Sequence, residues 1–151
     1  MTEPELPLSD ADYQRLLALR TNLRGFLHWS EAQAKAVGLT PAQHQLLLAV
    51  RGHDDSRGPT IGELADYLFL RHHSAVGLVD RADQAGLVRK SGDPDDARVV
   101  RVAHTTAGSR ALADLSQRHV EELARLAANL RPLLRGLELE QDDHGGSRAA
   151  S

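Results

Sequence analysis

Apolar residues recur at spacings of three and four over the first part of the chain and again from Thr105 onward, which is the period of an amphipathic helix. This pattern predicts long helices over residues 9–38 and 105–137. Pro132 is expected to interrupt the second helix, because proline lacks the amide that a helix interior needs. The first of these helices is longer than a lone small domain requires, so it is either a core helix of a larger bundle or a dimerisation arm.

Between these segments the helical pattern is shorter and is broken by turn residues. Helices are expected to begin at Thr40 and Thr60, each of which is followed three residues later by Gln or Glu, the pattern of a capping box. After a break at residues 69–71, a further short helix ends at Gly86. Two short helices joined by a tight turn indicate a helix-turn-helix. The residues predicted to form the buried face of the second helix are Val76, Val79 and Ala82.

Two segments rich in β-branched or basic side chains, residues 87–91 and 98–103, are separated by turn-forming residues and predict a hairpin. Beside a helix-turn-helix, such a hairpin is a wing. The predicted fold class is therefore mainly α with a small β-wing: a winged helix-turn-helix domain over residues 40–104, flanked by long N- and C-terminal dimerisation helices. We expect residues 1–8 to be mobile and the polar segment 138–151 to form a disordered tail.

Several motifs in this part of the sequence resemble the MarR family of winged helix-turn-helix regulators. They are Leu-Val-Asp-Arg at positions 78–81, Gly-Leu-Val at 86–88, Asp-Pro-Asp-Asp-Ala-Arg at 93–98 and Thr-Thr-Ala-Gly at 105–108. Each motif is weak alone, but their order and spacing are specific together. The resemblance implies a homodimeric transcription regulator whose second short helix reads DNA. Two such helices about one DNA turn apart, ~34 Å, predict a pseudo-palindromic operator of double-stranded DNA.

The candidate DNA-binding residues lie on the second short helix and in the wing. They are Arg71, His72, His73, Ser74, Gly77, Arg81, Asp96 and Arg98. Histidine and serine can hydrogen-bond base edges, a glycine allows close approach of the backbone, and an arginine beside the turn can hold a phosphate. The competing interpretation is a solvated helix face that reads nothing.

The resemblance implies that Arg98 enters the minor groove and that Asp96 holds it. A narrow minor groove concentrates negative potential, so this contact needs no base code. Two positions depart from the family pattern. Ala97 stands where many members carry another arginine, and His104 replaces the leucine usual before Thr105.

Charge does not mark the central domain as basic. The net charge of the chain is −3, and basic and acidic side chains between residues 57 and 104 are equal in number. DNA binding therefore requires the cations to gather on one face. A winged-helix protein-interaction module without specific DNA binding remains the alternative.

Several other kinds of chemistry are disfavoured. The absence of cysteine excludes disulfides, thiolate metal sites and thiol-based peroxide sensing. No nucleophile elbow, P-loop or dinucleotide fingerprint appears, so we expect neither an enzyme nor a bound cofactor. Asp93 does not begin an EF-hand, because Arg98 and His104 stand where glycine and glutamate are needed. No metal is predicted; a site assembled from distant histidines is the minor alternative, with His28, His44, His104 and His119 as its candidates.

The resemblance also implies a repressor that a small-molecule effector, for example an anionic aromatic compound, releases from DNA. The candidate effector-pocket residues are Phe26, His28, Trp29 and His44. Their competing interpretation is as ordinary core or interface residues. The chain lacks an apolar run long enough to span a bilayer and a signal-peptide pattern at its N-terminus, so we expect a cytoplasmic protein with no membrane partner.

Overall fold

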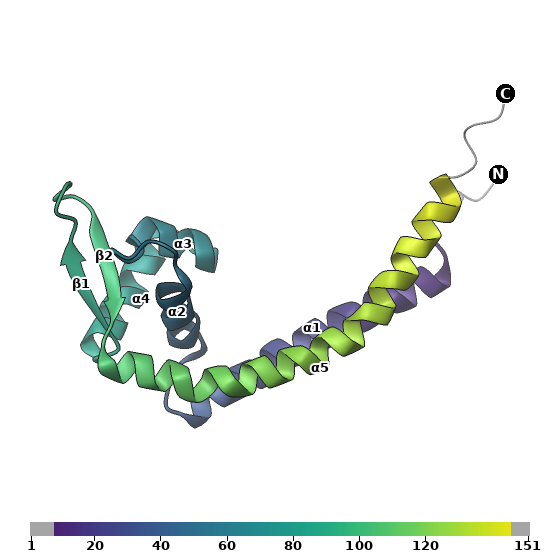
Figure 1. The fold of residues 1–151 in the computed structure, drawn as a ribbon, viewed down its shortest axis with the longest axis horizontal. Helices are drawn as coiled ribbons and strands as arrows, with labels where there is room; N and C mark the ends of the chain where they lie inside the picture. Colours follow the sequence, from purple (N-terminus) through teal and green to yellow (C-terminus); the bar gives the residue numbers. More distant parts are fainter. Residues whose placement is uncertain (1–7, 146–151) are drawn as a thin grey trace. The chain divides into compact units, whose positions relative to one another are not determined.

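The computed structural model describes residues 8–145, with side chains described as far as residue 137. Within this range the chain forms five helices and one two-stranded antiparallel sheet (Figure 1). In chain order these are α1 (Asp10–Ala36), α2 (Pro41–Gly52), α3 (Ile61–Leu68), α4 (His72–Gln84), β1 (Val88–Gly92), β2 (Val100–His104) and α5 (Thr106–Gly145). The predicted fold class, mainly α with a small β-wing, is confirmed.

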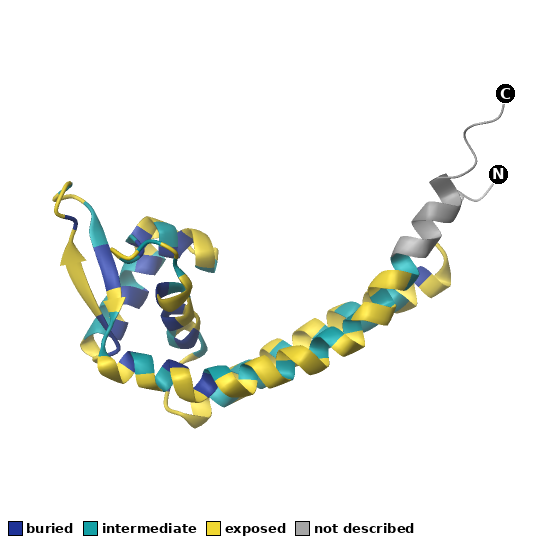
Figure 2. Ribbon diagram, in the orientation of Figure 1, coloured by how far each residue is buried: buried dark blue, intermediate teal, exposed yellow. Residues whose placement is uncertain are grey.

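The chain divides into two compact units. The arm unit contains the chain up to residue 29 and from residue 119 onward, and the winged unit contains residues 30–118. Figure 2 shows the buried residues concentrated in the winged unit, where α2, α3, α4 and the sheet pack together. The largest fully buried aliphatic side chains there are Leu46, Leu47, Leu64, Val79, Val88, Val102 and Leu115.

Local capping determines where the first two helices begin. The Ser9 hydroxyl accepts a hydrogen bond from the Asp12 amide at 3.2 Å, and the Asp12 carboxylate accepts one from the Ser9 amide at 3.0 Å. The predicted capping box at Thr40 is complete, because Thr40 and Gln43 each bond the other's backbone amide at 3.1 Å. These reciprocal bonds satisfy amides that a helix N-terminus otherwise leaves unpaired.

The junction between the sheet and α5 explains the Thr-x-x-Gly motif. The Thr105 hydroxyl accepts a hydrogen bond from the Gly108 amide at 3.1 Å, and the Thr105 amide donates to the Leu87 carbonyl at 3.0 Å. A Cβ atom on Gly108 would lie 2.0 Å from that same carbonyl oxygen and 3.0 Å from Leu47 Cδ2. Only a glycine therefore lets the first turn of α5 pack against residue 87.

Helix α5 differs from its prediction at its C-terminal end. The helix continues through Pro132 to Gly145, so the predicted interruption is wrong. Pro132 is exposed, and water can therefore bond the carbonyl that its missing amide leaves free. The helix includes residues 138–145 of the segment predicted to be disordered. Residues 1–7 and 146–151 lie outside the described residues.

Over the described residues, none of the helices combines the length and the apolar character that crossing a membrane requires.

Substituting Gly108 tests how the first turn of α5 packs within the winged unit. Gly108→Ala is expected to lower the free energy of unfolding by about 1–3 kcal/mol, because the new methyl group overlaps the Leu87 carbonyl. The control is Gly25→Ala in α1, where a Cβ meets nothing within 4 Å; it should raise stability by roughly 0.5–1 kcal/mol. Urea denaturation followed by circular dichroism measures both. Unchanged stability of Gly108→Ala would contradict this packing.

Candidate nucleic-acid interface

Helix α3 begins at Thr60 with only half of the predicted capping box. The Thr60 hydroxyl accepts a hydrogen bond from the Glu63 amide at 3.1 Å, as expected. The Glu63 carboxylate does not return to the Thr60 amide. It accepts the Thr60 hydroxyl at 3.2 Å and lies 2.9 Å from Nε2 of His53, in the loop before α3. Thr60 itself pairs with Arg101 of β2 as an isolated antiparallel bridge.

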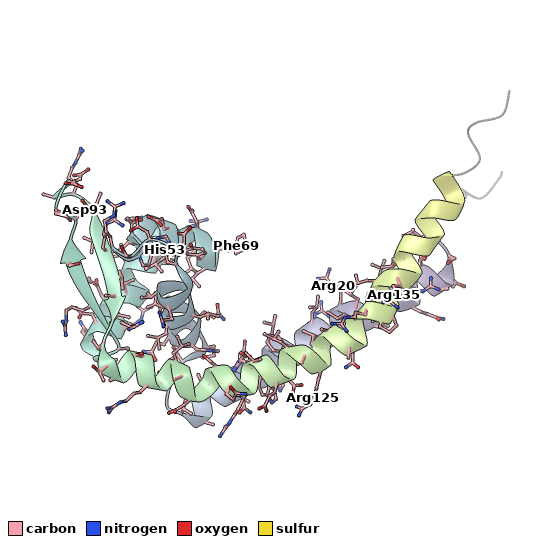
Figure 3. All side chains as sticks on the ribbon, in the orientation of Figure 1. Arg20, His53, Phe69, Asp93, Arg125 and Arg135 are labelled. Atoms are coloured by element: carbon pink, nitrogen blue, oxygen red, sulfur yellow. The ribbon has the colours of Figure 1, made fainter. Side chains whose placement is uncertain are left out.

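The turn between α3 and α4 lies at residues 69–71, as predicted. Phe69 ends α3 in the left-handed backbone region with φ 53°, and the Leu70 amide donates to the Ala65 carbonyl at 2.9 Å. Phe69 is 96% exposed and points away from the winged unit (Figure 3). Arg71 occupies the N-cap position of α4 without a side-chain cap bond, because its guanidinium has no acceptor for the helix amides.

The buried face of α4 differs from its prediction. The structure buries Ala75, Leu78, Val79 and Ala82, whereas Val76 is only half-buried. Spacing alone could not choose between neighbouring stripes, because residues 75–79 form an unbroken run of apolar residues and glycine. The side of α4 left open by this packing carries Arg71, His72, His73 and Arg81 as exposed residues and Ser74 and Gly77 as half-buried ones.

Gly77 lies beside the side chain of Arg81. A Cβ atom at this position would lie 3.2 Å from Nη1 of Arg81, one helical turn further on. The Arg81 guanidinium thus folds back over residue 77. Gly77 provides space for this arginine, in addition to any close approach of a ligand to the backbone.

The wing is a short hairpin with an ordered tip. Its strands run over residues 88–92 and 100–104, one to two positions later than predicted at their beginnings, with Gly92 opposite Val100 at the tip end. Beyond the strands, the Asp96 carboxylate accepts hydrogen bonds from the amide of Arg98 at 3.0 Å and from its Nε at 3.2 Å. The Arg98 side chain is 89% exposed. Asp96 therefore orients a solvent-facing arginine at the wing tip.

A buried ion pair lies beneath this tip. Asp93 and Arg101 are each 9% exposed, and Arg101 Nε donates to one carboxylate oxygen of Asp93. The other oxygen accepts the amides of Asp95 at 2.8 Å and Asp96 at 3.2 Å. These bonds, that from Arg101 foremost, hold the pKa of Asp93 below its usual range. Arg101 is one of the basic residues between positions 57 and 104, and no sequence signal indicates that β2 buries it.

Two predicted residues line a common hollow. His72 at the start of α4 and Arg98 of the wing border a hollow of about 230 Å³, together with Thr60, Ile61, Gly62, Val99 and Val100. The structure thus brings the beginnings of α3 and α4 together with the wing arginine.

Internal ion pairs reduce the positive charge available on this unit. Lys90 Nζ lies 2.6 Å from Asp80, which raises the pKa of Lys90, and Arg57 lies 2.8 Å from Asp55. Among the residues that the structure describes, Arg71, Arg81 and Arg89 are exposed and have no ion pair.

The predicted effector residues are divided between the units. Phe26 and Trp29 stack in the arm unit with ring centroids 6.1 Å apart, and His119, which the prediction omitted, lies 4.8 Å from Trp29. His28 is exposed on α1, and His44 is buried on α2 in the winged unit. In the described part of the chain, no group of three or more histidine, aspartate or glutamate side chains could hold a metal ion.

A helix-turn-helix with an exposed second helix, followed by a hairpin with an arginine at its tip, defines a winged helix-turn-helix protein. The profile of the MarR family matches residues 37–99. An uncharacterized HTH-type transcriptional regulator of Bacillus subtilis (strain 168), YcgE, is 33% identical over 114 residues, which span 74% of this chain and 67% of the relative. The chain belongs to the MarR family, whose members are transcription regulators and not enzymes.

Solved structures share the fold at lower sequence identity. AbsC, a MarR family transcriptional regulator from Streptomyces coelicolor, is 19% identical with a TM-score of 0.66, over 87% of this chain and 97% of that one. A MarR mutant from E. coli complexed with operator DNA is 22% identical with a TM-score of 0.65, over 86% and 91%. The S. aureus MepR–DNA complex is 18% identical with a TM-score of 0.64, over 83% and 94%.

The wing tip is expected to loosen in acid. Because the folded-state pKa of Asp93 is depressed, its carboxylate stabilises the tip above the unfolded value of about 3.9 and ceases to do so as pH falls through the folded value. Amide hydrogen exchange by NMR at Asp95 and Asp96 should therefore show lost protection at the acid end of a titration. In Asp93→Asn this pH dependence should be much smaller. A wild-type tip equally protected throughout would contradict the assignment.

Proposed function

We propose that this protein is a homodimeric, sequence-specific DNA-binding transcription regulator, and that it acts as a repressor released by a small-molecule effector. The observation that carries the proposal is the common hollow between α3, α4 and the wing, which His72 and Arg98 line. In this arrangement α4 enters the major groove while the wing reaches the adjacent minor groove. The E. coli MarR mutant and S. aureus MepR, which share the fold, are in complexes with DNA.

Each candidate residue has a role in this proposal. His73 and Ser74 offer hydrogen-bonding groups to base edges from the first turns of α4. Arg71 and Arg81, both exposed, are the proposed phosphate contacts. Arg98, oriented by Asp96, supplies the minor-groove contact.

The arm unit supports the proposed dimer. Its two helices leave large apolar side chains exposed in the single chain: Tyr13, Leu16, Leu17, Leu23, Leu27, Val120, Leu123 and Leu134. An apolar surface of this extent on a pair of helices is suited to burial against a second copy. A twofold dimer would present two α4 helices to a pseudo-palindromic operator.

The proposed effector has less support. A hollow of about 270 Å³ in the arm unit is lined by Phe26, Glu122 and neighbouring residues of α1 and α5. The carboxylate of Glu122 disfavours an anion, although Arg125 binds it at 2.6 Å. An aromatic effector at this hollow would therefore be neutral or cationic rather than anionic.

One observation favours the alternative function, a winged-helix module that binds protein. Phe69 is 96% exposed, Tyr67 is 50% exposed, and they line a hollow together with Glu63 and Asp66. An acidic, aromatic surface repels a phosphate backbone but suits a basic protein segment.

Titration against the protein's own promoter region at several salt concentrations tests DNA binding. Specific duplex should bind tighter than random duplex, with affinity falling as salt rises. Arg98→Ala should weaken specific binding by roughly tenfold or more, since it removes a charge-assisted contact. Its control, Arg125→Ala, removes the same charge from the arm unit and should leave affinity within about twofold. Equal binding of both duplexes by wild type would favour the protein-binding alternative.

Sedimentation velocity tests the dimer. The wild-type chain should sediment as a dimer, and Leu27→Glu should shift it toward monomer, because this half-exposed leucine would otherwise be buried against the partner. Gln14→Glu adds the same charge at an exposed position of the same helix and should remain dimeric. A stable wild-type monomer would refute the proposed role of the arm unit.

A further inference from the structure

The buried Asp93–Arg101 pair lies outside every contact so far assigned to DNA. We infer that Arg101 is a positioning residue for DNA recognition, which fixes the wing tip relative to the recognition helix without touching DNA. This inference rests on the proposed DNA-binding function and concerns how its minor-groove arginine is held in place. With 9% of its surface exposed, Arg101 is not itself available to a phosphate.

A continuous series of polar contacts leads from Arg101 to Arg98. Arg101 Nε donates to Oδ2 of Asp93, and Oδ1 of Asp93 accepts the Asp95 and Asp96 amides. Asp96 in turn accepts the amide and Nε of Arg98. Figure 3 shows Asp93 at the wing, close to its tip. Releasing the Asp93 carboxylate would therefore free the turn that places Asp96, and with it the direction in which Arg98 points.

The same guanidinium also reaches the segment that leads into α3. Arg101 Nη1 donates to the Gly58 carbonyl at 2.8 Å. Gly58 has a φ of 85°, and a Cβ there would lie 2.6 Å from the Val102 carbonyl oxygen. The Val102 amide donates to the Pro59 carbonyl at 3.0 Å. Arg101 thus joins the wing tip to the residues immediately before the helix-turn-helix.

The geometry of arginine suits this role better than that of lysine. A planar guanidinium can donate in two directions at once, here to a carboxylate from Nε and to a carbonyl from Nη1. A lysine ammonium is a point charge at the end of a flexible chain, and it does not fix the relative direction of two acceptors.

Stability alone is a weak explanation for this pair. Burying two charges has a desolvation cost, and apolar pairs of similar volume often stabilise a fold as well or better. The Arg101 side chain is 11% exposed and that of Asp93 is 5% exposed, so this cost applies here. Unlike an apolar pair, the ion pair fixes the orientation of the Asp93 carboxylate, which accepts hydrogen bonds from the wing-tip amides.

A double-mutant cycle between Arg101 and Arg98 tests the inference. Arg101→Met is expected to weaken binding to the promoter duplex by about tenfold, close to the effect of Arg98→Ala, because it acts through Arg98. In an Arg98→Ala background, Arg101→Met should then lower the affinity for the promoter duplex by less than about twofold. The matched control is Arg89→Met, at an exposed arginine on the other strand of the hairpin, whose effect should be the same in both backgrounds. If the losses of binding free energy caused by Arg101→Met and Arg98→Ala were additive in the double variant, the inference would be overturned.

A second variant separates geometry from charge. Arg101→Lys keeps the positive charge but loses the two-directional donor, so it should bind DNA no better than Arg101→Met. Full affinity in Arg101→Lys would overturn the geometric argument. If Arg101→Met does not fold, Asp93→Asn replaces it in the cycle, since its amide oxygen can still accept the backbone amides while the ion pair is lost.

A readout without DNA distinguishes this inference from the proposed function. NMR order parameters of residues 93–98 should fall in Arg101→Met and remain at the wild-type level in Arg89→Met. If wild type fails to discriminate its promoter but the tip still loosens in Arg101→Met, the DNA-binding proposal fails while the bracing by Arg101 stands. A tip that stays equally ordered in Arg101→Met would overturn the inference whatever the DNA result.

Discussion

The close approach of β2 to the segment before α3 is the constraint on which the rest of the winged unit depends. A side chain larger than hydrogen at Gly58 would meet the Val102 carbonyl, and the next residues pair with β2 through Pro59 and Thr60. Thr60 then begins α3, and the left-handed Phe69 turns the chain into α4. One set of backbone contacts therefore positions both α4 and the wing, because both lie close in sequence to this junction.

The second constraint is electrostatic. The chain carries a net charge of −3, and the winged unit neutralises Lys90, Arg57 and Arg101 internally. A DNA-binding surface with so few free cations gains little from nonspecific attraction. Under the proposed function, its affinity comes from correct placement of a small number of groups and from the simultaneous use of two sites in the proposed dimer. The proposed DNA affinity therefore depends more strongly on the orientation of Arg98 by Asp96, and of Asp96 by Asp93, than it would in a strongly basic protein.

The sequence was sufficient for several features that a local rule determines, although the proline rule failed at Pro132. The cap at Thr40, the break at 69–71 and the hairpin tip follow from residues within three or four positions of one another. It was insufficient where distant segments compete. Glu63 lies beside His53 and does not close its capping box, and β2 buries Arg101, which the sequence gives no reason to expect. The DNA-binding and effector residues remain predictions, because contact with a ligand depends on partners outside the chain.

Hydrogen exchange measured with and without the promoter duplex most directly tests the central claim, that α4 and the wing form one DNA-binding surface. Mass spectrometry of peptides should show slowed exchange on DNA binding over residues 72–81 and 93–99, with little change over residues 63–69, where the acidic aromatic hollow lies. Slowed exchange confined to residues 63–69, or to the arm unit, would contradict the account.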